Sequence, residues 1–175
     1  MNRRSLVIGS AGVAAAAAGI ATALWRRSVL PEAVPGTANP QAPTHFEKPD
    51  GGKLVLADFA GKPLLLNFWA TWCPPCVREM PLLDRFADEQ RASGWQVVGL
   101  AVDKIEPVRE FLLKHPVRYP IAVAGMDALE WLRLLGNSGG GLPFSVVFDS
   151  AGGTVQRKLG EIGSSELAEW TARVR

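Results

Sequence analysis

Cysteine and histidine are scarce in this chain, which has only two of each among its 175 residues. Cys73 and Cys76 lie three residues apart, whereas His45 and His115 are distant from them in the sequence. Two thiols are too few for a self-contained four-ligand zinc site, and we interpret both histidines as surface residues. We therefore predict no metal site and no bound cofactor, which leaves the cysteine pair as the candidate reactive group.

Positive charge is also sparse once the N-terminus is set aside. The formal net charge is +2, and four arginines (Arg3, Arg4, Arg26 and Arg27) flank an apolar segment. Subtracting their four charges from +2 leaves −2 for the remainder. No basic stripe is left to bind a polyanion, so we predict no nucleic-acid partner. A chain with 47% hydrophobic and 21% charged residues can build the core of one ordinary domain.

The apolar segment 5–24 contains no charged residue and is rich in alanine and glycine. About twenty helical residues span a bilayer core of about 30 Å. Three interpretations remain open: a cleaved signal peptide with an A-x-A site at 21–23, an uncleaved membrane anchor, or a twin-arginine signal formed by residues 2–7. All three place the rest of the chain outside the cytoplasm, in the periplasm or on the periplasmic face of the inner membrane.

The predicted domain organisation follows from the composition of the next segments. Residues 1–27 form the signal peptide or anchor, and residues 28–45 form a proline-rich linker that contains Pro31, Pro35, Pro40 and Pro43. The folded domain covers residues 46–175.

Short apolar runs alternate with amphipathic stretches along this domain. We expect a strand pair within 46–56 around an Asp-Gly turn, and strands at 64–69, 95–102, 119–123, 144–148 and 154–159. Helices are expected at 77–90, 107–114, 127–135 and 166–174. We expect Asp127 to cap the third helix, Ser164 or Ser165 to cap the last, and Pro81 to kink the first. The alternation predicts an α/β fold whose sheet is covered on both faces.

The cysteines stand between the strand at 64–69 and the helix that follows it. Pro74 and Pro75 lack backbone N–H groups, so they fit a turn or the first positions of a helix. Cys73 then lies at or near the helix N-cap, where the macrodipole favours a thiolate. We predict that Cys73 is the accessible nucleophile and Cys76 the shielded resolving thiol. The alternative is a permanently closed structural disulfide, but so short a ring restrains little chain entropy.

Residues 68–76, Phe-Trp-Ala-Thr-Trp-Cys-Pro-Pro-Cys, resemble the active-site signature of the thioredoxin superfamily. Three further features are similar to its TlpA/ResA branch of exported thiol-disulfide oxidoreductases: the run 61–73, Glu79 followed by Met80-Pro81, and the extra helix and strand between Val102 and Asp127. The resemblance implies a thioredoxin fold, in which a mixed central sheet is flanked by helices. It also implies that Leu142-Pro143 is the cis-proline loop.

The resemblance implies roles for several residues. Glu79 would be a partly buried carboxylate that passes protons during exchange; otherwise it is an exposed helix residue. Asn67 stands where cytoplasmic thioredoxins carry a buried aspartate. A cis Pro143, rather than an ordinary trans turn proline, would leave the Leu142 backbone free to bind an extended substrate. Trp72, Pro74 and Pro75 would shape the docking surface, although core packing is the alternative for Trp72. The glycine-rich loop 138–141 predicts a mobile partner-binding edge.

Together these features predict an extracytoplasmic thiol-disulfide oxidoreductase that reduces selected proteins. Family analogy indicates apocytochrome c thiols or copper-site cysteines as clients, but a fold does not establish a substrate. An oxidising compartment supplies no electrons, so a membrane thiol carrier is the expected partner. Three alternatives stay open: a thiol oxidant, a module that binds Cu(I) through the two thiolates, and a redox-inert interaction domain.

Overall fold

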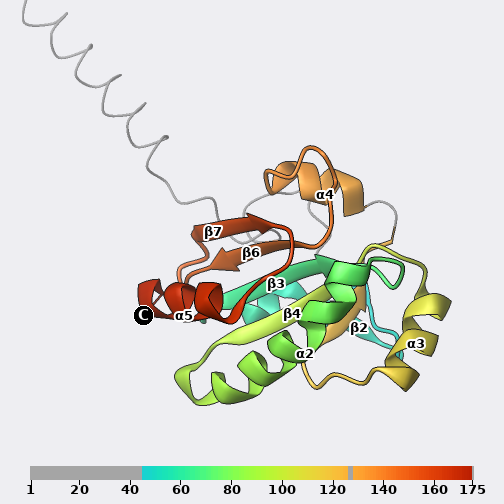
Figure 1. Ribbon diagram of the computed structural model, residues 1–175, viewed down its shortest axis with the longest axis horizontal. Coiled ribbons are helices and arrows are strands. Elements are labelled where there is room, and N and C mark those ends of the chain that lie inside the picture. The colour runs from blue at the N-terminus through green and yellow to red at the C-terminus, as the bar shows by residue number, and fades with distance from the viewer. Residues whose placement is uncertain (1–44, 126–127, 175) are drawn as a thin grey trace, which may run out of the picture. The chain divides into compact units, whose positions relative to one another are not determined.

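The computed structural model describes residues 45–125 and 128–174, and a seven-stranded mixed sheet forms the centre of this part of the chain (Figure 1). The strand order is β2-β1-β5-β4-β3-β6-β7. The strands are β1 (His45–Glu47), β2 (Lys53–Val55), β3 (Leu64–Trp69), β4 (Gln96–Ala101), β5 (Ile121–Val123), β6 (Phe144–Phe148) and β7 (Thr154–Leu159).

Strand β3 lies deep in the sheet, and all six of its residues are buried. It runs parallel to β4, with Leu64 opposite Gln96 and Trp69 opposite Ala101, and antiparallel to β6. Strand β5 continues the parallel part beside β4, whereas β7 and the β1–β2 pair add antiparallel edges. Because parallel strands end at the same edge of a sheet, the segments that follow β3 and β4 emerge side by side.

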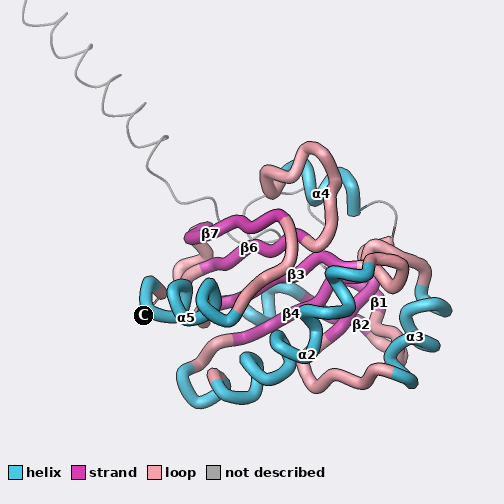
Figure 2. The backbone as a smooth tube through the Cα atoms, viewed as in Figure 1, coloured by secondary structure: helices cyan, strands magenta, loops and turns pink. Residues whose placement is uncertain are grey.

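Helices cover both faces of the sheet (Figures 1 and 2). The α2-side core unites β3 residues Leu65 and Trp69 with residues of three helices: α2 (Pro74–Glu89), α3 (Ile105–Lys114) and α5 (Ser164–Arg173). The α4-side core unites Leu64, Leu66 and Phe68 with α4 (Ala128–Leu134) and the 3-10 helix η1 (Leu56–Phe59). A second 3-10 helix, η2 (Arg91–Ser93), follows α2. The alternation along β3 therefore divides its side chains between two hydrophobic layers.

The predicted thioredoxin fold is confirmed, including the β1–β2 pair and the inserted α3–β5 segment. Three helices begin before their predicted ranges: α2 at Pro74 instead of 77, α3 at Ile105 instead of 107, and α5 at Ser164 instead of 166. The predicted position of Cys73 at the N-cap of α2 is confirmed. Helix α2 begins at Pro74, because prolines at its first two positions need no N–H partner, and it continues through Pro81 to Glu89. The N-cap of α5 is Gly163, whose N–H donates to the Glu166 carboxylate at 2.9 Å, and Ser164 is already helical.

Some predictions fall on other parts of the chain. The export segment, nearly all of the linker and the Asp127 cap lie outside the described residues. Across 45–125 and 128–174, no helix is both long and apolar enough to cross a membrane.

Candidate active site

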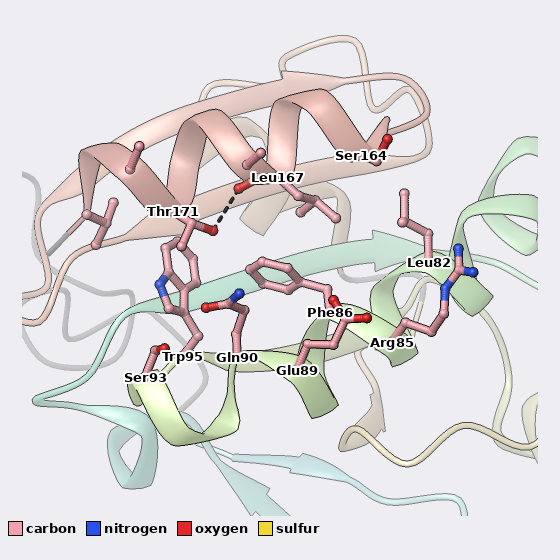
Figure 3. Close-up of a pocket in the computed structure, with 13 residues that line it drawn as sticks. Leu82, Arg85, Phe86, Glu89, Gln90, Ser93, Trp95, Ser164, Leu167 and Thr171 are labelled. Carbon is pink, nitrogen blue, oxygen red and sulfur yellow. Dashed lines mark hydrogen bonds between the residues drawn. The ribbon is translucent and has the colours of Figure 1, made fainter.

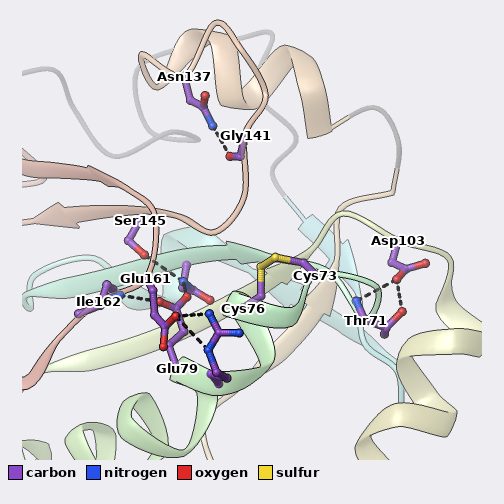
Figure 4. Close-up of a disulfide and its surroundings, with 12 residues drawn as sticks. Thr71, Cys73, Cys76, Glu79, Asp103, Asn137, Gly141, Ser145, Glu161 and Ile162 are labelled. Atoms are coloured by element: carbon purple, nitrogen blue, oxygen red, sulfur yellow. Dashed lines mark hydrogen bonds and ion pairs between the residues drawn. A yellow bond between two sulfur atoms is a disulfide. The ribbon is translucent and has the colours of Figure 1, made fainter.

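A disulfide joins Cys73 and Cys76 at the start of α2, with their Cα atoms 5.3 Å apart (Figure 4). Cys73 is the N-cap residue of the helix, and its carbonyl accepts the Val77 N–H at 3.2 Å. The Cys73 N–H in turn donates to the Ala70 carbonyl at 3.2 Å. The first cysteine therefore lies at the positive end of the helix macrodipole, where a thiolate is stabilised.

The two cysteines differ in exposure less than the sequence predicts. Cys76 is completely buried, and Cys73 is only 5% exposed, because both belong to the α2-side core. The expected solvent access of Cys73 is thus small in the disulfide form, although it exceeds that of Cys76. The neighbouring Trp72 is 64% exposed, so it is a surface residue and not a core residue. Pro74 is exposed too, and Pro75 is half-buried.

Asp103 holds the turn that leads into the cysteines. One of its carboxylate oxygens, Oδ2, accepts hydrogen bonds from the Thr71 backbone N–H at 3.1 Å and from the Thr71 hydroxyl at 2.6 Å (Figure 4). The other oxygen accepts the Lys104 N–H at 2.8 Å. Asp103 was not identified from the sequence. The signal was available, because Thr71 and Asp103 each follow one of two neighbouring parallel strands.

Glu79 lies on α2 three residues after Cys76, which places both on the same side of the helix. It is only 1% exposed, so the alternative of an exposed helix residue was wrong. Its Oε1 accepts a hydrogen bond from Asn67 Nδ2 at 2.7 Å, and its Oε2 accepts one from the Ile162 backbone N–H at 2.9 Å. Burial raises the pKa of Glu79 to about 7, even though both hydrogen bonds favour the carboxylate.

The loop between β7 and α5, residues 160–163, contacts this carboxylate. Arg78 Nη2 forms an ion pair with Glu161 Oε2 at 2.7 Å. The next residue of each segment is also paired, because the Ile162 N–H donates to Glu79 (Figure 4). Consecutive residues of α2 thus bind consecutive residues of the loop. The negative charge of Glu161 adds to the increase in the pKa of Glu79.

Leu142 and Pro143 form the second half of the site. Their peptide bond is cis, and the Pro143 carbonyl accepts the Gly160 N–H at 2.8 Å. The Leu142 side chain packs against the α2-side core, which contains both cysteines. Among the described residues, the backbone N–H and C=O of Leu142 have no hydrogen-bond partner. Asn137 Nδ2 donates to the Gly141 carbonyl at 2.8 Å and so binds the preceding loop; the predicted mobility of this loop stays a prediction.

Figure 3 shows a separate groove of about 810 Å³ between α2 and α5. Phe86, Trp95 and Leu167 lie along it, whereas Cys73, Cys76 and Glu79 do not. The part of the chain that the structure describes has no group of three or more histidine, cysteine, aspartate or glutamate side chains arranged to hold a metal ion.

The sequence matches the Redoxin family model over residues 35–173. The thiol-disulfide oxidoreductase ResA of Bacillus cereus is 30% identical over 127 residues, which are 71% of this chain and 70% of that protein. ResA of Geobacillus kaustophilus is 31% identical over 115 residues, which are 64% of this chain and 63% of that protein.

Solved structures share the fold. A thioredoxin-related protein from Neisseria meningitidis serogroup B is 31% identical, with a TM-score of 0.62 over 71% of this chain and 93% of that one. A thiol:disulfide interchange protein from Chlorobium tepidum is 24% identical, with a TM-score of 0.70 over 82% of this chain and 96% of that one. With the Cys73–Cys76 disulfide at a helix start, these matches identify the chain as a member of the Redoxin family and a thiol-disulfide oxidoreductase of the ResA type.

Proposed function

We propose that the protein is an extracytoplasmic protein disulfide reductase in which Cys73 attacks, Cys76 resolves and Glu79 carries the proton. The observation that carries this proposal is the buried Glu79 carboxyl one helical turn beyond Cys76, with its pKa raised to about 7. A base with a pKa close to the working pH exchanges protons most effectively. An ordinary glutamate, with a pKa of about 4.3, would be a weaker base for a thiol.

The reaction begins with the reduced pair. The Cys73 thiolate attacks one sulfur of a client disulfide, which forms a mixed disulfide and releases the other client sulfur as a thiolate that takes up a proton from the solvent. The Cys76 thiol then transfers its proton to the Glu79 carboxylate and attacks Cys73. The second client sulfur leaves, and it takes up the proton that Glu79 has received. The client gains two electrons and two protons, and the enzyme retains the Cys73–Cys76 disulfide.

Client docking is assigned to the surface around the disulfide. The Leu142 backbone N–H and C=O, which have no partner among the described residues, can form hydrogen bonds with an extended client segment that lies beside them like a strand. Trp72, which precedes Cys73, and Leu159, which is opposite Phe144 in the β6–β7 ladder, are exposed by 64% and 61%, and they offer apolar contacts. Pro74 and Pro75 present no N–H groups there, so a client backbone meets no competing donor from them.

The proposed location rests on the sequence. The apolar segment 5–24 between paired arginines supports export, with the mature domain in the periplasm or anchored on the periplasmic face of the inner membrane. A membrane thiol carrier would supply electrons, because each turnover oxidises the cysteine pair. Proteins with cysteine pairs that must be reduced before they bind haem or copper are the proposed clients.

The test is the rate at which the reduced protein reduces insulin, measured from pH 5 to pH 9. Glu79→Gln should lower this rate about 10- to 100-fold and remove the inflection near pH 7, because the variant has no carboxylate to accept a proton. Glu89→Gln is the matched control, since Glu89 is an exposed residue of the same helix. An unchanged profile for Glu79→Gln would refute the assigned role.

A further inference from the structure

Asn67, Ser145 and Glu79 form a buried polar group within the α2-side layer. Asn67 and Ser145 are direct partners in the antiparallel β3–β6 ladder, and the Asn67 side chain contacts both Ser145 and Glu79 of α2. Asn67 Nδ2 donates to Glu79 Oε1 at 2.7 Å and to Ser145 Oγ at 2.9 Å. All three residues are at most 1% exposed. Each hydrogen bond here forms away from bulk water, so the match between donors and acceptors matters.

The present arrangement suits the ionised form of Glu79. Each carboxylate oxygen faces an N–H donor, from Asn67 at Oε1 and from Ile162 at Oε2. A protonated carboxyl must itself donate through its O–H, and neither of these nitrogens can accept that hydrogen bond. The side-chain oxygen of Asn67, Oδ1, has by contrast no hydrogen-bond partner among the described residues. Asn67 Oδ1 could therefore accept a hydrogen bond from a protonated Glu79. In this structure, however, Asn67 presents its nitrogen and not its oxygen to Glu79.

We propose that the Asn67 amide turns over by half a rotation when Glu79 takes up a proton, so that Asn67 Oδ1 accepts the Glu79 O–H. Ser145 permits this turn, because a hydroxyl both accepts and donates. It accepts an N–H from Asn67 while Glu79 is ionised, and it donates to Oδ1 after the turn. No proton passes to Asn67 or Ser145. They are positioning residues that hold each protonation state of Glu79 in turn.

Asn67 is the side chain that hydrogen-bonds the Glu79 carboxyl among the described residues, whereas the other titratable groups nearby do not. Glu161 forms an ion pair with Arg78 and Glu166 one with Lys158, and the hydroxyl of the buried Tyr119 has no hydrogen-bond partner among the described residues. The charges of Glu161 and Glu166 favour protonation of Glu79, but no hydrogen bond joins either of them to its carboxyl. An aspartate at position 67 would place a second carboxyl beside Glu79, and two ionised carboxylates there would repel each other, whereas a neutral amide supports both states of Glu79.

Neutron diffraction from deuterium-exchanged crystals of the oxidised protein tests the turn directly. At pH 8.5 the Asn67 nitrogen should face Glu79. At pH 5.5, below the pKa of about 7, the Asn67 oxygen should face Glu79 and a deuteron should lie on Oε1. The disulfide form is used because its cysteines do not titrate. An Asn67 nitrogen that faces Glu79 at both pH values would overturn the proposal.

A second measurement follows the same turn in solution. At pH 8.5 the side-chain amide protons of Asn67 should show NOEs to the Ser145 β-protons, because the nitrogen lies 2.9 Å from Ser145 Oγ. In Glu79→Gln the amide oxygen should accept the Ile162 N–H and the amide nitrogen should face Asn67, so the variant should lose these NOEs at pH 8.5. Glu89→Gln, the exposed control, should retain them. NOEs that persist in Glu79→Gln would overturn the proposal.

The inference adds to the proposed proton-carrying role of Glu79, and the two can fail separately. An Asn67 amide that turns with pH, combined with an unchanged insulin reduction rate in Glu79→Gln, refutes the proton-carrying role and supports the turn. An Asn67 amide that keeps one orientation, combined with a slowed Glu79→Gln, refutes the turn and supports the proton-carrying role.

Discussion

The Ile162 backbone N–H donates a 2.9 Å hydrogen bond to Glu79 Oε2 across 83 residues of sequence. Through this one carboxylate, the loop before α5 is joined to the helix that carries both cysteines. Asn67 Nδ2 joins the same carboxylate to the central strand β3. We therefore expect the protonation state of Glu79 to affect the stability of the fold and, under the proposed mechanism, the chemistry of the thiols.

Stability should depend on the ionisation of Glu79. The pKa of Glu79 is about 7 in the folded protein against 4.5 for the free side chain, so between these values the folded state binds more protons than the unfolded state. The free energy of unfolding should therefore decrease as the pH rises from 4.5 to 7, by roughly 3 kcal/mol in all. Urea unfolding of the oxidised protein at pH 4.5, 6 and 8 measures this slope. Glu79→Gln should lack the slope and Glu89→Gln should keep it, whereas equal slopes in both variants would contradict the assignment.

Substitution of Cys73 and substitution of Cys76 should have different effects on the mixed disulfide with the client. Cys76→Ser should accumulate a mixed disulfide with insulin chains, because Cys73 still attacks and nothing resolves the adduct. Cys73→Ser should form no adduct and should lose reduction activity, because Cys76 is completely buried. Non-reducing electrophoresis and mass spectrometry detect the adduct. Accumulation in Cys73→Ser instead of Cys76→Ser would reverse the assigned roles.

Asp103 should contribute to the stability of the active-site turn. Asp103→Ala removes the acceptor for the Thr71 N–H, the Thr71 hydroxyl and the Lys104 N–H. The loss should lower the free energy of unfolding by about 1–3 kcal/mol, since the Thr71 and Lys104 groups lose a partly buried partner. Chemical denaturation measures the change, with Asp58→Ala as an exposed control. Equal stability of the two variants would show that Asp103 does not hold the turn.

Client docking should depend on the exposed apolar residues around the disulfide. Leu159→Lys and Trp72→Ala should raise the KM for insulin several-fold and leave the reduction of glutathione disulfide nearly unchanged, because the small substrate does not extend to these residues. Leu113→Lys is the matched control, since Leu113 is 80% exposed on α3. An effect of Leu113→Lys as large as that of Leu159→Lys would mean that charge, and not position, is responsible.

Most of the fold could be predicted from the sequence. Apolar runs predict β3 and β6 to the residue, and the hairpin turn after β6 predicts its partner β7 to the residue. Helix starts were less certain. Local pattern leaves open whether Pro74 and Pro75 form a turn or the first positions of α2. It does not show that Gly163 replaces the neighbouring serines as the cap of α5.

The site was predictable only where its residues are close in sequence or carried by the family resemblance. The Cys73–Cys76 pair is local, and Glu79 follows on the same helix. The hydrogen bond between Ile162 and Glu79 depends on loop closure over 83 residues, and the one between Ser145 and Asn67 depends on strand register over 78 residues. Periodicity encodes neither. The burial that raises the pKa of Glu79 is likewise a product of tertiary packing.

The reduction potential of the Cys73–Cys76 pair tests the proposed reductase most directly. It is measured by equilibrating the protein with dithiothreitol or glutathione buffers at pH 7 and quantifying the free thiols. A protein disulfide reductase should have a potential at or below about −200 mV, in the range of glutaredoxins and thioredoxin. A potential near −120 mV, as in the strong oxidant DsbA, would contradict the proposed direction of electron transfer.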